Sequence, residues 1–421
     1  MTADAPQADQ NPSFRDPSGS VFVEGGILYR RVTKLGEPDY QHLMRSGLYE
    51  SLTADGLLIE HEDAGQRAAS PSGVERLLRP IRVPLVSYPP EWCFSQLKDA
   101  ARLTLTVMRR ASACGMRLKD ASADNVQFVG GRPVFVDTLS FERASSGPWV
   151  AYRQFCQHFL APLAVMSRVD PRLSRLALTF PDGIPLDLAS RMLPRRTLVS
   201  PCLLAHLHLH AAAERRLKRA RVQSSGTGPR DARMTPAALH SLLDHLQACV
   251  ERQRWKPRGD WLRYYESLSR YTEQDLARKG TLVREWLARA RPRTVWDIGA
   301  NTGRFSRVAA EQAALVFAID ADAACVEKLY LQLKEAGPPN ILPLVGDIAN
   351  PSPGTGWANR ERRSLESRGP ADMSHLLARR PHVAADYSPE GFERAFEAVF
   401  RVERRQPIAD TGRVLYLMER R

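Results

Sequence analysis

The chain has 421 residues, 43% of them hydrophobic and 25% charged, a composition that fits a globular protein with two or three domains. No run approaches the ~18–20 consecutive apolar residues of a membrane helix, so we expect no membrane association. The formal net charge of +13 invites a nucleic-acid partner, but nearly all basic residues are arginines spread along the chain, often beside acidic residues. Codon bias explains that skew, and nucleic acid is kept as the weaker alternative.

An α+β domain is predicted over residues 21–217. Residues 1–20 are polar and lack an apolar signal core, so we expect a disordered N-terminus and a cytoplasmic location. Glycine pairs between short apolar runs predict one hairpin within Ser20–Val32 and a second hairpin around Gly130-Gly131. Helical patterns lie at 40–54, 92–114, 149–166 and 203–217, and 80–90 reads as loop.

A linker and a helical extension are predicted next. Residues 218–235 are basic, then rich in Ser, Gly and Pro, which favours a linker. A Thr-Pro pair opens the first of three predicted helices, which make up an extension over 236–292. From 293 to 421, short apolar strands alternate with helices, which predicts an α/β domain with a doubly wound sheet.

The first strand of that domain, Thr294–Ile298, runs into a glycine-rich turn. Gly299 and Gly303 stand where the backbone turns tightly and a ligand can approach without meeting a Cβ. A helix follows, and its first N–H groups and positive dipole end suit a carboxylate. The GxxxG spacing differs from the GxGxxG that cradles a dinucleotide pyrophosphate, which disfavours an NAD enzyme.

Two acidic residues follow the next two predicted strands. Leu315–Ile319 ends at Asp320, whose carboxylate can accept hydrogen bonds from ribose hydroxyls. Ile341–Val345 is followed by Asp347, an acceptor for an adenine amino group. The order strand, GxxxG, helix, strand, Asp, helix, strand, Asp predicts a site for an adenosine-containing cofactor.

Asp297–Gly303 (DIGANTG) resembles motif I of class I S-adenosyl-L-methionine dependent methyltransferases, and Asp320 and Asp347 match the second and third acidic positions of that family. With the rest of the chain, the resemblance extends to a bacterial, nodulation-related type. It implies S-adenosyl-L-methionine as cofactor and a Rossmann-like sheet. The implied cofactor contacts are Asp297, Gly299, Asn301, Gly303, Asp320 and Asp347. A Rossmann-like nucleotide-binding protein of another kind is the alternative.

The polar segment 350–363 follows the third strand, at the edge of the sheet where ligands bind. Its Trp357, Asn359, Glu361 and Arg362 are candidates for the substrate side of the site. A solvated loop with a structural tryptophan is the alternative.

Compared with the family it resembles, the sequence lacks most of strand four, the helix that follows it and strand five. After Asp372-Met373, no apolar strand occurs before 399–404 and 413–419, which match the terminal antiparallel strands. A crossover to a parallel strand alone needs at least ~10–12 residues, so the intervening segment is too short for both. We therefore expect an incomplete sheet, an open edge on the first strand, and weak or absent catalysis.

A second constellation lies in the N-terminal domain. Asp120, Asn125 and Asp137 resemble the base, amide and metal-binding acid of protein kinases, spaced around the second hairpin. Leu118-Lys119 and Thr138-Leu139 depart from the kinase pattern, and the chain has no convincing Gly-rich loop or strand lysine. A kinase-like scaffold, active phosphotransfer and coincidence all remain open.

No metal site is predicted. His206, His208 and His210 would share one face only on a strand, and the surrounding Leu and Ala favour a helix, where they diverge. The six cysteines form no CxxC pair, so we expect unpaired thiols.

The sequence thus predicts an α/β protein in which an incomplete Rossmann-like sheet follows a separate α+β, kinase-like domain. We expect a methyltransferase whose acceptor, a small molecule or a macromolecule, is not identified. A non-catalytic S-adenosylmethionine-binding scaffold and a phosphotransferase are the alternatives.

Overall fold

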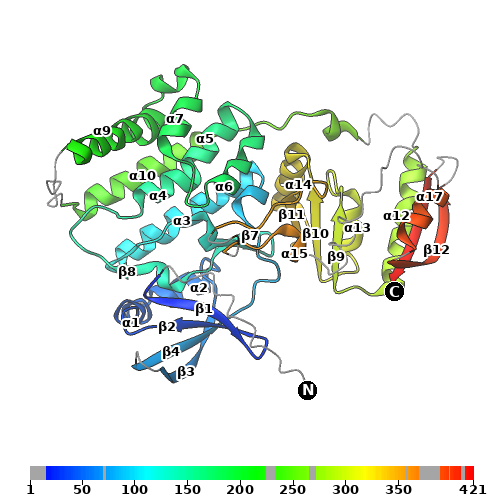
Figure 1. Cartoon of the computed structure of the whole chain (residues 1–421), viewed down its shortest axis with the longest axis horizontal. Coiled ribbons are helices and arrows are strands. Elements are labelled where there is room, and N and C mark those ends of the chain that lie inside the picture. The colour runs from blue at the N-terminus through cyan, green and yellow to red at the C-terminus, as the bar shows by residue number, and fades with distance from the viewer. Residues whose placement is uncertain are drawn as a thin grey trace. The chain divides into compact units, whose positions relative to one another are not determined.

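The computed structural model describes residues 16–69, 73–223, 233–264, 272–356, 359, 361–368, 389–397, 399–408 and 413–421. The protein is mixed α/β with several small sheets (Figure 1). It divides into two compact units. The first is Met1–Trp255 with Gly354–Arg362, and the second is Lys256–Pro353 with Arg363–Arg421.

A four-stranded antiparallel sheet in the order β1-β2-β4-β3 opens the first unit (Figure 1). The first predicted hairpin is confirmed, because Glu24 pairs with Ile27 across Gly25 and Gly26, which both have positive φ. The other two strands were not predicted, since their sequences lack a regular apolar alternation. The bounds are β1 Gly19–Glu24, β2 Ile27–Val32, β3 His61–Ala69 and β4 Gly73–Pro80.

Helix α3 (Phe94–Ala113) is the long buried helix of the first unit, as the pattern at 92–114 predicts. It contacts β7, the second strand of the other predicted hairpin, in which Val129 pairs with Arg132 across the glycine pair. That hairpin prediction is also confirmed. The remaining elements of this region are α1 Glu37–Arg45, α2 Leu48–Ala54, β5 Met116–Leu118, β6 Val126–Val129, β7 Arg132–Phe135 and β8 Phe141–Arg143.

The rest of the first unit is helical, as predicted for 149–166 and 203–217. Helix α9 runs to Gln223, into the segment predicted as a linker, and residues 224–232 lie outside the described residues. The helix that opens the predicted extension, α10, belongs to the first unit and packs on α3. The elements are α4 Tyr152–Phe155, η4 Cys156–Leu160, α5 Ala161–Arg168, α6 Leu176–Thr179, α7 Leu186–Met192, α8 Pro201–Leu203, η7 Leu204–Leu209, α9 His210–Gln223 and α10 Pro236–Arg252.

The expectation of unpaired thiols is wrong for two cysteines. Cys202 and Cys249 form a disulfide, because α8 and α10 bring their Cα atoms to 5.5 Å.

The second unit contains a three-stranded parallel sheet in the order β11-β10-β9 (Figure 1). All three predicted strands are confirmed. Small and branched side chains of the sheet, such as Val316 and Ala318, pack with Leu329 in one buried cluster. The elements are α12 Glu273–Ala290, β9 Thr294–Ile298, α13 Arg304–Ala310, β10 Leu315–Asp320, α14 Ala323–Ala336 and β11 Ile341–Val345.

The C-terminal strands pair with each other in a separate antiparallel sheet, β12 (Phe400–Ile408) and β13 (Arg413–Arg420). Among the described strands, only β10 pairs with β9, so the other edge of β9 is open there. The short helices α15 (Leu365–Arg368) and α17 (Pro389–Phe396) complete this unit. Asp372 and Met373, the predicted start of strand four, lie outside the described residues.

Within the described ranges, none of the helices is both long and apolar enough to cross a membrane.

Candidate functional site

The turn between β9 and α13 is open at its first glycine. Gly299 has φ +73°, and a Cβ built on it would meet no atom within 4 Å. Its N–H and that of Ala300 both donate to the carbonyl of Ile319, at 2.8 and 3.0 Å, which ties the turn to the end of β10. A backbone in this conformation with free space beside it lets a ligand approach closely.

Asp320, at the end of β10, lies directly against this turn. One carboxylate oxygen accepts the N–H of Asn301 at 2.7 Å, and the other accepts the N–H of Asp322 at 2.8 Å. Each carboxylate oxygen can accept more than one hydrogen bond, so acceptor capacity remains for a ligand hydroxyl. The structure therefore brings together the turn and the acid that the sequence assigns to one site.

Three other predicted cofactor residues make contacts that stabilise the turn. The side-chain amide of Asn301 donates to the carbonyl of Trp261 at 2.8 Å, and the residue is only 7% exposed. A Cβ on Gly303 would lie 2.5 Å from Cδ1 of Leu329, so this glycine is needed for packing between α13 and α14. The third residue, Asp297, accepts a hydrogen bond from Ser306.

Asp297, in β9, is half-buried, and its carboxylate contacts the start of α13. Ser306 Oγ donates to the carboxylate at 2.6 Å. Burial raises the pKa of Asp297, and the hydrogen bond from Ser306 and the charge of Lys279 oppose that shift. Lys279, which the sequence did not single out, also lies 4.3 Å from the centre of the Phe305 ring.

Asp347 lies at the end of β11, next to the end of β10. The preceding residue, Gly346, donates its N–H to the carbonyl of Asp320 at 2.9 Å. Asp347 itself accepts the N–H of Ala349 at 2.8 Å and so closes a turn. The carboxyl ends of all three strands, and both predicted acids, therefore meet at one edge of the sheet.

The exposed indole of Trp261 was missed by sequence reasoning. It lies in the short turn η8 (Asp260–Arg263) and is 58% exposed. Its backbone carbonyl receives the Asn301 amide, so the η8 turn lies beside the glycine-rich turn. No local sequence signal marks this contact, since the two residues are far apart in the chain.

The predicted substrate-side segment belongs to the first compact unit, which corrects its assignment to the 293–421 domain. The reason is Arg362, whose side chain is 8% exposed and forms an ion pair with Asp124 at 2.6 Å. It also donates to the carbonyls of Ala177 and Pro181, at 3.0 and 2.8 Å. Three protein acceptors occupy this guanidinium, so it anchors the segment rather than facing a substrate.

Two of the other three predicted residues of that segment, Asn359 and Glu361, lie among the described residues. Asn359 is exposed, with φ +59° and its N–H donating to Gly356. The side chain of Glu361 packs where a Cβ on Gly356 would lie. Trp357 lies outside the described residues.

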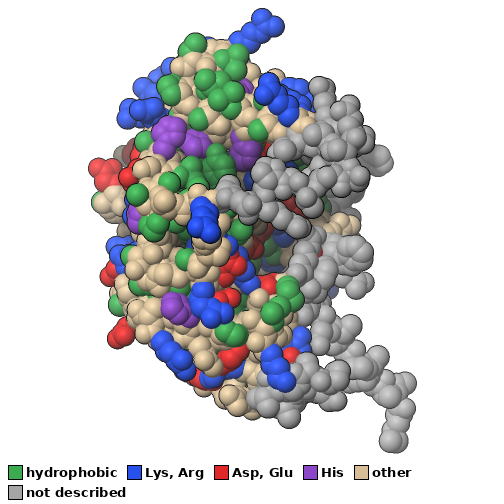
Figure 2. Space-filling model, turned by 90° about the vertical axis from the view of Figure 1, so that its left-hand side faces the viewer, with side chains coloured by type: hydrophobic (Ala, Val, Ile, Leu, Met, Phe, Trp, Pro, Cys, Tyr) green, Lys and Arg blue, Asp and Glu red, His purple; other side chains and the backbone are tan. Residues whose placement is uncertain are grey.

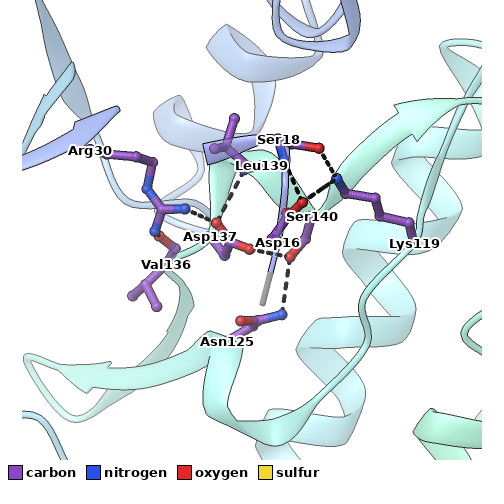
Figure 3. Close-up of polar contacts among 9 residues, drawn as sticks. All are labelled: Asp16, Ser18, Arg30, Lys119, Asn125, Val136, Asp137, Leu139 and Ser140. Atoms are coloured by element: carbon purple, nitrogen blue, oxygen red, sulfur yellow. Dashed lines mark hydrogen bonds and ion pairs between the residues drawn. The ribbon is translucent and has the colours of Figure 1, made fainter. Parts of the chain in front are cut away.

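The kinase-like hairpin brings two of its three predicted residues together (Figure 3). The hydroxyl of Ser140 donates to Asp137 and accepts the Asn125 amide at 3.0 Å. Asp120 instead accepts the N–H of Ser122 at 2.8 Å, which closes a local turn. Asn125 and Asp137 thus form a polar centre, and Asp120 stabilises the loop that leads to it.

An arginine neutralises Asp137. Arg30, from β2, donates to the same carboxylate oxygen that accepts the N–H of Leu139, and it also donates to the carbonyl of Val136 (Figure 3). Burial lowers the pKa of Arg30 to about 10, so it stays charged at neutral pH. A metal ion at Asp137 would have to displace or tolerate this cation.

Lys119 closes the other side of this centre, where it contacts Asp16 and Ser18 (Figure 3). Among the described residues on the face shown in Figure 2, basic side chains are interspersed with acidic ones.

Three comparisons place these features among known proteins. No protein-family model matches the chain. The chain is 32% identical over 383 residues to the nodulation protein NoeA of Rhizobium meliloti (strain 1021), a match that covers 88% of this chain and 78% of that protein. A solved structure of vaccinia related kinase 3 matches 31% of this chain and 46% of its own, with 10% identity and a TM-score of 0.23, which is too low to support a shared fold.

Proposed function

This chain belongs to the family of the nodulation protein NoeA, and we propose that its second unit binds S-adenosylmethionine as the methyl donor of a methyltransferase. The observation that carries this proposal is the contact between Asp320 and the glycine-rich turn, beside the open space at Gly299. It joins an acid that suits ribose hydroxyls to a turn without a side chain.

The residues at this edge fit the chemistry of the cofactor. The space that a Cβ on Gly299 would occupy is free, so the amino-acid portion of the ligand can approach the backbone. Asp320 would accept from the ribose, and Asp347, at the end of the neighbouring strand, would accept from the adenine amino group. Bound there, S-adenosylmethionine supplies an activated methyl group on a sulfonium, and the protein's part is to align donor and acceptor and exclude water.

The open edge of β9 favours a second candidate function, binding of S-adenosylmethionine without turnover. In the family that the sequence resembles, the next strand on this side faces the transferred methyl group. Among the described residues no strand pairs with that edge, and Ile298 at its end is 36% exposed. A site without that wall would bind the cofactor but align the acceptor poorly.

A phosphotransferase in the first unit is the third candidate and the weakest. Asn125 and Asp137 are adjacent through Ser140, which is the observation in its favour. The ion pair between Arg30 and Asp137 argues for a scaffold instead. A thermal-shift measurement with ATP and Mg²⁺ tests it, because a functional site would raise the melting temperature and a scaffold would not.

Calorimetric titration of the full chain with S-adenosylmethionine tests the cofactor proposal. We expect saturable binding that weakens at least tenfold, about 1.4 kcal/mol, in Asp320→Asn. Asp322→Asn is the matched control, since Asp322 caps α14 by accepting the N–H of Ala324 and asparagine caps equally well. Absence of binding at millimolar ligand by the folded wild-type chain contradicts the proposal.

Methyl transfer is measured separately. Label from S-adenosylmethionine carrying a radioactive methyl group should appear in an acceptor when an extract of the native host is added. Binding without labelled product, at any extract concentration, favours the second candidate over the first.

A further inference from the structure

Two cysteine–histidine pairs face each other in the helical part of the first unit. Cys202 and His206 are four residues apart on the continuous α8–η7 helical segment. His245 and Cys249 are four residues apart on α10, in the reverse order. Residues at this spacing lie on one face of a helix, so each helix presents one sulfur and one imidazole to the other.

The side chains of His206, His245 and Cys249 converge, and Cys202 joins them through its bond to Cys249. Nε2 of His206 lies 2.7 Å from Nδ1 of His245. One ring nitrogen of each histidine and Sγ of Cys249 all lie within 4.8 Å of one another, and Cys202 is bonded to Cys249. Tetrahedral zinc, with Zn–N near 2.0 Å and Zn–S near 2.3 Å, needs ligand atoms about 3.3–3.8 Å apart. Small side-chain movements therefore suffice once the disulfide is reduced.

The surroundings suit a metal ligand set. Cys202 and Cys249 are 0% exposed and His206 is 4% exposed. The hydroxyl of Tyr152 lies 2.7 Å from Nδ1 of His206, which directs the other ring nitrogen toward the cluster. Metal-bound histidines typically have such a partner on their second nitrogen.

We propose that Cys202, His206, His245 and Cys249 bind one Zn²⁺ in the reduced protein. The site is independent of the proposed S-adenosylmethionine site in the second unit. Two thiolates and two neutral imidazoles around Zn²⁺ carry no net charge, which suits a buried position. Four protein ligands leave no open coordination position, so the role is structural.

Formation of the site from the oxidised protein is a balanced exchange. A dithiol reductant gives two electrons and two protons to the Cys202–Cys249 disulfide and is itself oxidised to a disulfide. Zn²⁺ then displaces the two thiol protons and binds the two sulfurs. The metal replaces the covalent link between the α8–η7 segment and α10, which spans 47 residues of sequence.

The neighbouring histidines do not compete for this role. His208 lies 2.8 Å from Ser190 Oγ and 2.9 Å from Thr197 Oγ1. The ring of His210 stacks on Tyr152. Only the first histidine of the HxHxH run therefore faces α10.

The test compares reduced and oxidised wild-type protein. Full-length chain is reduced with a dithiol, equilibrated with excess Zn²⁺, dialysed and analysed for metal by mass spectrometry. We expect about one zinc per chain in the reduced protein and none after oxidation of the disulfide. Co²⁺ in place of Zn²⁺ should give the visible absorption of a tetrahedral thiolate site in the reduced form alone.

Variants assign the ligands. Cys249→Ser and His245→Asn should each lower zinc retention at least tenfold. Cys114→Ser, which removes a half-buried cysteine outside the cluster, should leave it unchanged. Reduced wild-type protein that retains no zinc and gives no cobalt spectrum overturns the proposal, as does equal zinc in the oxidised form. The comparison of the two wild-type forms decides the matter even if a variant does not fold.

Discussion

Substitution of the two glycines of the β9–α13 turn by alanine separates a ligand-binding role from a packing role. Gly299 and Gly303 have nearly the same positive φ, +73° and +76°. Alanine therefore meets a similar backbone strain at both, roughly 1–2 kcal/mol, less about 0.4–1 kcal/mol regained from the less flexible unfolded chain. What differs between the two positions is the space around the new Cβ.

At Gly303 the new Cβ would lie 2.5 and 2.9 Å from the two terminal carbons of Leu329, which is 0% exposed. Overpacking of this kind costs about 1–3 kcal/mol, so we expect Gly303→Ala to destabilise the second unit by roughly 2–4 kcal/mol. At Gly299 nothing lies within 4 Å, and Gly299→Ala should cost only about 1 kcal/mol. Its Cβ would instead occupy the space proposed for the cofactor.

Urea titration followed by hydrogen exchange of the β9–β11 peptides measures the local stability of each variant. Calorimetry with S-adenosylmethionine measures its affinity. We expect Gly303→Ala to have the lower free energy of unfolding. We expect Gly299→Ala to lose affinity for S-adenosylmethionine although its free energy of unfolding changes little. Equal destabilisation by both substitutions would refute the packing argument, and unchanged affinity of Gly299→Ala would refute the ligand argument.

Three further predictions concern buried and half-buried titratable side chains of the first unit. Arg362→Ala should destabilise that unit by about 1–3 kcal/mol in chemical denaturation, because the half-buried Asp124 and the carbonyls of Ala177 and Pro181 lose their donor. A loss below 0.5 kcal/mol would contradict this. Arg30→Met should lower the melting temperature more than Asp137→Asn does, because the first substitution leaves the Asp137 carboxylate without its cation and the second keeps a polar partner for Arg30. The reverse order of melting temperatures would contradict this prediction. Burial and the charge of Arg30 lower the pKa of His61 to about 4. As the pH falls, His61 is therefore protonated near pH 6.5 in the unfolded chain but only near pH 4 in the folded chain. Stability is therefore full above pH 6.5 and falls by about 1–3 kcal/mol between pH 6.5 and 4, and His61→Gln should flatten that slope in denaturation curves at stepped pH.

Most of the second unit's sheet was predictable. Thr294–Ile298 and Ile341–Val345 are confirmed with the same bounds, and Leu315–Ile319 is one residue short of β10. Strands β10 and β11 are largely buried, so they are nearly continuous apolar runs that stand out from the surrounding helices, and β9 stands out by the glycine-rich turn that follows it. The two glycine-paired hairpins of the first unit were predicted for a similar local reason, since the turn residues lie next to the strands they join.

The polar strands and the long-range contacts were not predictable in this way. Strands β3 and β4 carry mixed side chains with no alternation, and their pairing comes from the sheet they join. The position of segment 354–362 in the first unit depends on Asp124, far away in the sequence. The same holds for the pairing of Arg30 with Asp137, which turns a predicted metal-binding acid into an ion pair.

The turn at Gly299–Gly303 and the acids at the ends of β10 and β11 are properties of short stretches, and the sequence by itself determined them. Only the tertiary structure decided which of those residues have space beside them, as at Gly299, and which are used in packing, as at Gly303. It also brought together two cysteine–histidine pairs that a search for CxxC and HxHxH spacings passes over. The physical reason is that an i, i+4 pair on one helix becomes a four-ligand site only when a second helix presents its own pair to the same point. The packing of the two helices determines whether the pairs meet, and a local sequence pattern does not encode that packing.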